Sequence, residues 1–239
     1  MEEKVNGLVI KSVEYGENDK ILTIFTLEKG VISAKIKGIK KAGAKLKFAS
    51  EPFCFAEYIL VKRGAFYSVI GAFLHDSFYP LRENIINYYA GAVILEFIKK
   101  FCPENVPFHN FILDTVNALK NLAYEDKKSY SVLLKFILQG LNAIGYGVDF
   151  SACEKCGSQI EREVFFDFDN GHVLCRECID EKSVQISPDT YFVLKCISNG
   201  EEVDNERYEK RALNMLVYYL GVKTGEKLGN FKEYLALLG

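Results

Sequence analysis

Histidine is scarce in this chain, and the sequence lacks the residue patterns on which most catalytic sites are built. Only three of the 239 residues are histidines, and they are scattered among otherwise apolar segments, as His75, His109 and His172. No serine elbow, phosphate-cradling glycine loop or paired-carboxylate motif accompanies them. A catalytic acid or base needs partners within hydrogen-bonding reach. The sequence therefore predicts a protein that is not an enzyme.

The chain also lacks the features that direct a protein into or across a membrane. It opens with Met1-Glu2-Glu3-Lys4 rather than a basic and then apolar leader, and no uninterrupted apolar run is long enough to span a bilayer. Seven cysteines, an odd number without an export signal, fit a reducing compartment better than a disulfide framework. We therefore expect a cytoplasmic protein with no membrane partner.

A large excess of charge is missing too, but the distribution of charge is uneven. The net charge of −2 predicts no nucleic-acid partner by itself, yet seven lysines and no acidic residue lie between Lys29 and Lys47. On a strand, Lys35 and Lys37 would share one face. A dense cationic loop beside a sheet suits a phosphate backbone, because each neutralised phosphate releases condensed counterions. The alternative is a solvated lysine face that aids solubility. The predicted nucleic-acid-binding residues are Lys35, Lys37, Lys40, Lys41, Lys45 and Lys47.

Four cysteines form two C-x-x-C pairs separated by 18 residues; they are Cys153, Cys156, Cys175 and Cys178. This spacing is typical of a tetrahedral zinc site. Gly157 follows the first pair, where a tight knuckle needs a residue without a Cβ. Four sulfurs leave no open position for water, so we expect one structural zinc ion and no hydrolytic chemistry. The alternative is a set of reduced thiols without a ligand. The other three cysteines lie in apolar segments and are expected to be buried.

Residues 1 to about 80 are rich in β-forming residues. Strands are expected at residues 5–15, 20–27, 31–39, 52–62 and 66–73. Five short strands, with a long basic connection after the third, suit a small barrel of the oligonucleotide-binding (OB) type. A simple β-meander has the same number of strands and stays open at this point. Four aromatic residues of this region are candidates for base stacking, although core packing is favoured for each: Tyr15, Phe25, Phe66 and Tyr67.

Beyond Pro80 the sequence pattern becomes helical. Residues 85–101 are apolar nearly all round and predict a buried helix, and amphipathic helices are expected after Pro107 and around residues 132–144. Ser187-Pro188 is a good helix start, and Asn199-Gly200 a good stop. Further helices are expected at residues 205–220 and 231–238. The predicted fold is α+β: an OB-type barrel domain at residues 1–80, then a helical domain at residues 81–239 with a zinc insert at about 149–182.

The order of these parts resembles the RecO family of bacterial DNA repair and recombination proteins. The turn Tyr15-Gly16-Glu17-Asn18-Asp19-Lys20 is similar to the family's opening, and residues 37–47 are similar to its basic loop. Gly145-Tyr146 and Asp149 match the approach to the cysteines, and residues 211–220 look like a late helix of the family. The resemblance spans essentially the whole chain. The basic loop departs from the family in carrying lysine and alanine where arginine and serine are common.

The resemblance implies a recombination mediator that binds single- and double-stranded DNA and anneals complementary strands. It also implies help in loading the recombinase on DNA coated by single-strand-binding protein (SSB), together with the partner RecR, in the bacterial cytoplasm at the nucleoid. The helical domain would receive the acidic C-terminal tail of SSB in an apolar pocket edged with basic groups. Without the resemblance, a zinc-stabilised OB-fold RNA-binding or interaction adaptor fits the same sequence.

Overall fold

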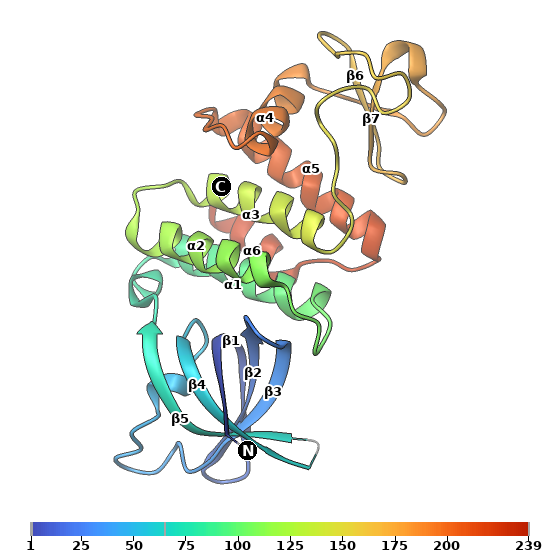
Figure 1. The fold of residues 1–239 in the computed structure, drawn as a ribbon. Coiled ribbons are helices and arrows are strands. Elements are labelled where there is room, and N and C mark those ends of the chain that lie inside the picture. Colours follow the sequence, from blue (N-terminus) through green and yellow to red (C-terminus); the bar gives the residue numbers. More distant parts are fainter. Residues whose placement is uncertain (1, 65, 239) are drawn as a thin grey trace. The chain divides into compact units, whose positions relative to one another are not determined.

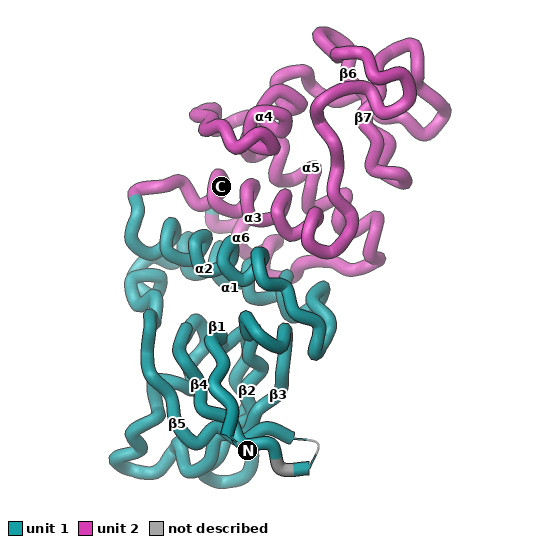
Figure 2. The backbone as a smooth tube through the Cα atoms, in the orientation of Figure 1, with its two compact units in different colours: residues 1–125, 238 teal, residues 126–237, 239 magenta. Residues whose placement is uncertain are grey.

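We describe the chain from a computed structural model, which covers residues 2–64 and 66–238. The chain divides into two compact units, residues 1–125 and residues 126–237 (Figure 2). Each unit is described by itself. The further division into a domain at residues 1–80 and one at 81–239 stays a prediction.

The first unit begins with a closed five-stranded barrel (Figure 1). Its strands are β1 (Glu2–Tyr15), β2 (Asp19–Thr26), β3 (Gly30–Ile36), β4 (Phe55–Arg63) and β5 (Phe66–Asp76). The strand order is β1-β2-β3-β5-β4, and β3 and β5 pair in parallel to close the barrel. A register shift between Val9 and Lys11 lets the long strand β1 pair with β4 along its first half and with β2 along its second half. The predicted OB-type barrel is therefore confirmed, and the open β-meander is excluded.

The barrel closes around side chains that alternate along its strands. On β3, Ile32, Ala34 and Ile36 are buried, whereas Ser33 and Lys35 face outward. Tyr58 of β4 fills the interior, and its hydroxyl donates a hydrogen bond of 3.1 Å to the carbonyl of Ala49 in the loop between β3 and β4. The loop is thereby fixed to the core at its far end, by a short 3₁₀ helix over residues Phe48–Ser50.

Two helices of the first unit pack across one end of the barrel (Figure 1). They are α1 (Ile85–Phe101), preceded by a 3₁₀ helix at Tyr79–Arg82, and α2 (His109–Tyr124). The ring of Phe25 on β2 lies 6.3 Å from that of Phe111 on α2. Phe53 at the end of the β3–β4 connection contacts Tyr88 of α1, with ring centroids 5.6 Å apart. These aromatic contacts plug the barrel end with apolar side chains.

The second unit is helical with a small sheet inserted in it. Its helices are α3 (Ser129–Ala143), α4 (Pro188–Ser198), α5 (Glu206–Thr224) and α6 (Gly229–Leu238), of which α3 and α4 both pack on α5. The inserted sheet has the order β7-β6-β8 and consists of β6 (Val164–Asp167), β7 (His172–Cys175) and β8 (Val184–Ile186). A 3₁₀ helix over Arg176–Cys178 follows β7. Residues 149–186 are called the cysteine module below.

The cysteine module is attached to helix α5 through aromatic pairs. The ring of Phe166 on β6 lies 5.4 Å from Tyr219, and that of Phe168 lies 5.0 Å from Tyr218, both in edge-to-face contact. Lys223 of α5 also donates a 2.7 Å hydrogen bond to the carbonyl oxygen of Asp169. The module is thus fixed to the helical scaffold by the turn between β6 and β7.

In the described part of the chain, no helix combines the length and the apolar character that a bilayer crossing requires.

Candidate metal centre and nucleic-acid interface

The four cysteines of the two C-x-x-C pairs converge at one end of the small sheet. Their Sγ atoms all lie within 4.8 Å of one another. Cys156 and Cys175 are 3.7 Å apart, close to the roughly 3.8 Å edge of a tetrahedron with metal–sulfur bonds of about 2.3 Å. The thiols alone therefore have the number, chemistry and spacing of a metal site, and these four residues would hold the ion.

Backbone hydrogen bonds hold the thiols in this arrangement. Gly157 has φ +72°, which a residue with a Cβ adopts only at a cost, and its N–H donates to the Cys153 carbonyl at 2.8 Å. The N–H of Cys175 points at Cys153 Sγ at 3.4 Å. Such donors stabilise thiolate sulfur. A bond from Glu154 N–H to the Val173 carbonyl, 2.9 Å, fastens the first pair to strand β7.

Crowding of the four thiols separates their pKa values. The Ser158 hydroxyl, 3.0 Å from Cys156 Sγ, lowers the pKa of Cys156 to about 6. Hydrogen bonds with Cys156 and Cys175 raise the pKa of Cys178 to about 12. Four adjacent thiols cannot all ionise together because their negative charges repel one another. A bound cation would remove this conflict, so the electrostatics of the cluster suit a metal ion.

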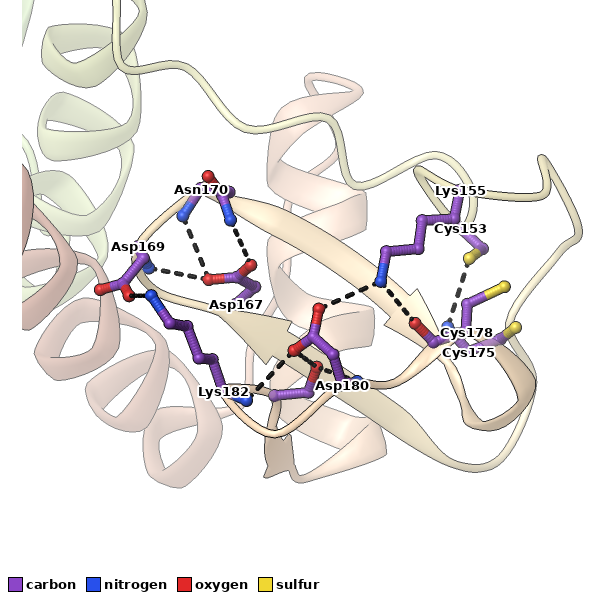
Figure 3. A network of polar contacts seen from close by, with 10 residues as sticks. Cys153, Lys155, Asp167, Asp169, Asn170, Cys175, Cys178, Asp180 and Lys182 are labelled. Atoms are coloured by element: carbon purple, nitrogen blue, oxygen red, sulfur yellow. Dashed lines mark hydrogen bonds and ion pairs between the residues drawn. The ribbon is translucent and has the colours of Figure 1, made fainter.

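Three of the four basic residues of the cysteine module pair with carboxylates of the same module, and Figure 3 shows the pairs of Lys155 and Lys182. The fourth, Arg162, has no ion pair among the described residues. Lys155 contacts Asp180 at 3.0 Å and donates a second 3.0 Å hydrogen bond to the carbonyl of Cys178. Lys182 pairs with Asp169 at 2.7 Å, and Arg176 pairs with Glu163. These cations are therefore used to hold the loops around the thiols.

A buried carboxylate at the end of β6 organises the connection between β6 and β7. Asp167 is 3% exposed and accepts hydrogen bonds from the N–H of Asp169 and from both the backbone and the side chain of Asn170 (Figure 3). These donors hold the pKa of Asp167 below its usual value even though burial opposes ionisation. The turn that contacts α5 is thereby made rigid.

The six lysines predicted to bind nucleic acid lie on β3 and on the loop that follows it. This lysine loop comprises residues 37–54. Lys35 points outward from β3, and Lys37, Lys40, Lys41, Lys45 and Lys47 are exposed. Strand β3 ends at Ile36 rather than at Ile39, because the N–H of Gly38 turns to Asp19 Oδ1 at 2.8 Å. The structure brings three of the six, Lys35, Lys37 and Lys41, to one groove of the barrel.

The fold also brings carboxylates to this region, which the acid-free stretch of sequence did not indicate. Lys35 pairs with Asp19 at 2.8 Å, and Lys40 pairs with Glu14 at 2.7 Å. The hydrogen bond from Lys35 and the one from Gly38 N–H lower the pKa of Asp19. Glu14 and Asp19 come from the β1–β2 hairpin, which only the barrel topology places beside β3.

The remaining four lysines of the set have no ion pair with any carboxylate of residues 2–64 and 66–238: Lys37, Lys41, Lys45 and Lys47. Two of them, Lys37 and Lys41, line an open groove of about 540 Å³ together with Lys35 and the turn from Tyr15 to Asp19. This groove is the candidate nucleic-acid interface. Its lining combines ammonium groups with an aromatic ring, the two chemistries that bind single strands.

The four candidate aromatic residues divide into two kinds. Phe25 is fully buried, as expected. Tyr67 is half-buried on β5, the strand that lies between β3 and β4 in the barrel. The preference for core packing was wrong for Tyr15 and Phe66, whose side chains are 51% and 72% exposed. Both lie at the ends of strands, where the alternation that fills a barrel interior no longer applies.

Comparisons with known proteins cover most of the chain. A family model described as "Recombination protein O N terminal" matches residues 1–78, and one described as "Recombination protein O C terminal" matches residues 82–230. The DNA repair protein RecO of Acetivibrio thermocellus is 31% identical over 77% of this chain and 74% of its own length. The DNA repair protein RecO of Clostridium novyi is 29% identical over 90% of this chain and 87% of its own. The chain, with its closed OB-type barrel, helical region and four-cysteine cluster, belongs to the RecO family of DNA repair and recombination proteins.

Proposed function

We propose that this protein is a recombination mediator in DNA repair that acts without catalysis. It binds single- and double-stranded DNA through the barrel and anneals complementary strands. Together with RecR, it helps load the recombinase on SSB-coated DNA, in the cytoplasm at the nucleoid. Family membership supports the general role, and the observation that carries the DNA-binding part is the group of exposed lysines on the closed barrel.

The physical basis of annealing is the repulsion between two polyanions. Two strands approach closely only when their phosphates are neutralised, and a lysine cluster does this without reading sequence. Lys37, Lys41, Lys45 and Lys47 are available for this role because no carboxylate in the described part of the chain neutralises them. A lysine side chain also suits this role because it is a point charge on a flexible stem, which can follow an irregular backbone.

We propose zinc as the metal of the cysteine module. Four thiolates in a tetrahedral arrangement are a preferred ligand set for a structural zinc ion, which would supply cross-linking of the β6–β7 sheet and no reaction chemistry. Lys155, hydrogen-bonded to the Cys178 carbonyl, lies where it offsets part of the negative charge of such a site. The cysteine module therefore has a structural role in the helical unit.

The helical unit offers a groove that fits the acidic, apolar C-terminal tail of SSB. A groove of about 490 Å³ lies between α5 and α6 and is lined mainly by apolar side chains, among them Val217, Leu228 and Phe231. Lys227 and Lys232 line it as well, beside Glu226. Other nearby cations have different partners: Lys210 pairs with Glu206, and Lys223 binds the cysteine module. We propose that this groove takes the tail, and that RecR docks elsewhere on the protein.

The test of the proposed function is annealing of complementary DNA oligonucleotides precoated with the cognate SSB, at low and at moderate salt. The protein should accelerate annealing, and the acceleration should fade as salt rises. A variant with alanine at Lys37, Lys41, Lys45 and Lys47 should lose most of it. No acceleration by the folded wild-type protein would contradict the mediator role, and RNA would become the next ligand to test.

The matched control removes the same amount of charge from exposed positions on the helices. Its substitutions to alanine are at Lys99, Lys120, Lys135 and Arg207. If this control variant anneals DNA as poorly as the loop variant, total charge and not the lysine loop carries the activity. In a separate assay, Lys232→Glu should weaken binding of a labelled acidic tail peptide, whereas Lys210→Glu should not.

A further inference from the structure

The barrel groove holds one exposed aromatic ring among its lysines. Tyr15 is the last residue of β1 and pairs with Asp19 across the turn formed by residues 16–18. Its side chain is 51% exposed and lines the groove of about 540 Å³, a volume within the range of about 300–1,000 Å³ typical of small-ligand sites. A ring in this position is available to a ligand and contributes little to the barrel core.

A neighbouring cation contacts the ring and restricts it. The Lys35 ammonium lies 4.4 Å from the centroid of the Tyr15 ring and 2.8 Å from Asp19 Oδ2. Asp19 in turn accepts the 2.8 Å hydrogen bond from Gly38 N–H, which fixes it to the start of the lysine loop. Restricting the ring before a ligand arrives reduces the entropy lost on binding.

The charges around the ring favour a phosphate on one side of it. Lys37 and Lys41 line the groove, while the charge of Asp19 is balanced by Lys35. Glu17 also lines the groove and has no ion pair within the described residues, so it disfavours a phosphate on its own side. A flat ring for a base, with ammonium groups beside it for the flanking phosphates, is the arrangement that binds a nucleotide of a single strand.

We propose that Tyr15 stacks on a base of single-stranded DNA and thereby sets the preference of the barrel for single strands over duplex. The inference rests on the proposed DNA binding and goes beyond it. In a duplex the bases are stacked on one another and present no free face, so the ring contributes only when a strand is open. The lysines contact the phosphates of both single-stranded and duplex DNA, whereas Tyr15 stacks only on a base of a single strand.

The first experiment uses the absence of tryptophan from the chain. Tyr15→Trp places a single indole in the groove, and its fluorescence should be quenched by an oligothymidine strand but much less by a duplex of the same length. Phe66→Trp is the matched control, because Phe66 is exposed on the same barrel but does not line the groove. Equal quenching by the two DNA forms, or equal responses at both positions, would overturn the assignment.

The second experiment measures affinity by fluorescence anisotropy at one salt concentration. Tyr15→Leu should weaken single-strand binding by about 5- to 150-fold, the effect of losing one stacked base, with less than about a two-fold change for duplex. Tyr15→Phe should restore binding, because stacking needs the ring and not the hydroxyl. If the wild type and Tyr15→Leu bind the single strand equally well, the stacking proposal is wrong but the proposed DNA binding stands. If wild type binds no DNA, the proposed function fails.

Discussion

The lysine loop and the cysteine module are both rich in basic residues, but they use them differently. In the cysteine module, Lys155, Arg176 and Lys182 each pair with a carboxylate of the same module. In the lysine loop, Lys40 alone pairs with a carboxylate among the described residues. Charges that pair internally hold loops in place and are largely neutral to a polyanion, whereas unpaired ones attract it. Counting basic residues in the sequence cannot make this distinction.

The largest effect expected is from breaking the metal site. Cys175→Ser removes one of four ligands, and structural zinc in small modules contributes about 10–16 kcal/mol of apparent binding free energy at neutral pH. We expect near-complete loss of bound zinc, measured by metal analysis under reducing conditions, and rapid hydrogen exchange throughout β6 and β7.

The control is Cys196→Ser, which alters a buried thiol on α4 outside the cluster. Zinc content should stay at one ion per chain in this variant. DNA binding by Cys175→Ser should persist, because the lysine loop lies in the other unit. A wild-type protein without zinc under reducing conditions would contradict the metal assignment.

The second effect tests how the cysteine module is attached to α5. A Cβ at Gly171 would lie 2.1 Å from the Tyr219 hydroxyl oxygen, and the residue has φ +77°. Gly171→Ala should lower the free energy of unfolding by about 2–5 kcal/mol, from a left-handed conformation and from overpacking. Urea unfolding measures the change. Gly157→Ala shares the positive φ but meets no atom within 4 Å, so it should cost only about 1–2 kcal/mol. Equal costs would show that the Tyr219 contact does not matter.

The third effect compares the two regions directly through salt dependence. Replacing Lys37, Lys41, Lys45 and Lys47 by alanine should lower the slope of log affinity against log salt for single-stranded DNA by up to about 2.8, at about 0.7 per lost phosphate contact. Replacing Lys155, Arg176 and Lys182 by alanine should leave the slope unchanged. A comparable drop in the second variant would show that paired charges also bind DNA, and the distinction between the regions would be lost.

Sequence reasoning predicted the elements better than the contacts between them. Helix α1 begins and ends where the apolar pattern predicted, at Ile85 and Phe101, and the five barrel strands were located to within a few residues. Local periodicity and caps determine these features. Strand β8, at Val184–Ile186, was missed because three largely exposed residues carry no pattern of their own and pair only with β6.

In the candidate sites, too, the sequence predicted local features better than long-range contacts. Cysteine spacing alone predicted a cluster that the structure brings within 4.8 Å. The lysines were found from local charge density, but their pairing with Glu14 and Asp19 depends on the register of β1, β2 and β3. The exposure of Tyr15 is likewise set by its place at the end of β1. Long-range neighbours of this kind follow from barrel closure and cannot be deduced from spacing along the chain.

The smallest effect expected concerns Asp19, the carboxylate that holds Lys35. Hydrogen bonds from Lys35 and Gly38 lower its pKa, so the ionised form is the one that stabilises the fold. Ionised Asp19 contributes fully to the free energy of unfolding above about pH 3.9, the pKa of an Asp side chain in the unfolded chain. This contribution is lost as the pH falls through the lower pKa that Asp19 has in the folded protein.

Asp19→Asn keeps an oxygen that can accept from Gly38 N–H but has no charge to lose. The wild type should therefore be slightly more resistant to urea than the variant at pH 7, and the two unfolding midpoints should converge below about pH 4. At pH 7 the variant also releases Lys35, which should raise the salt slope for single-stranded DNA by up to about 0.7. A difference in midpoint that persists unchanged to pH 3 would mean that the Asp19–Lys35 pair does not stabilise the barrel.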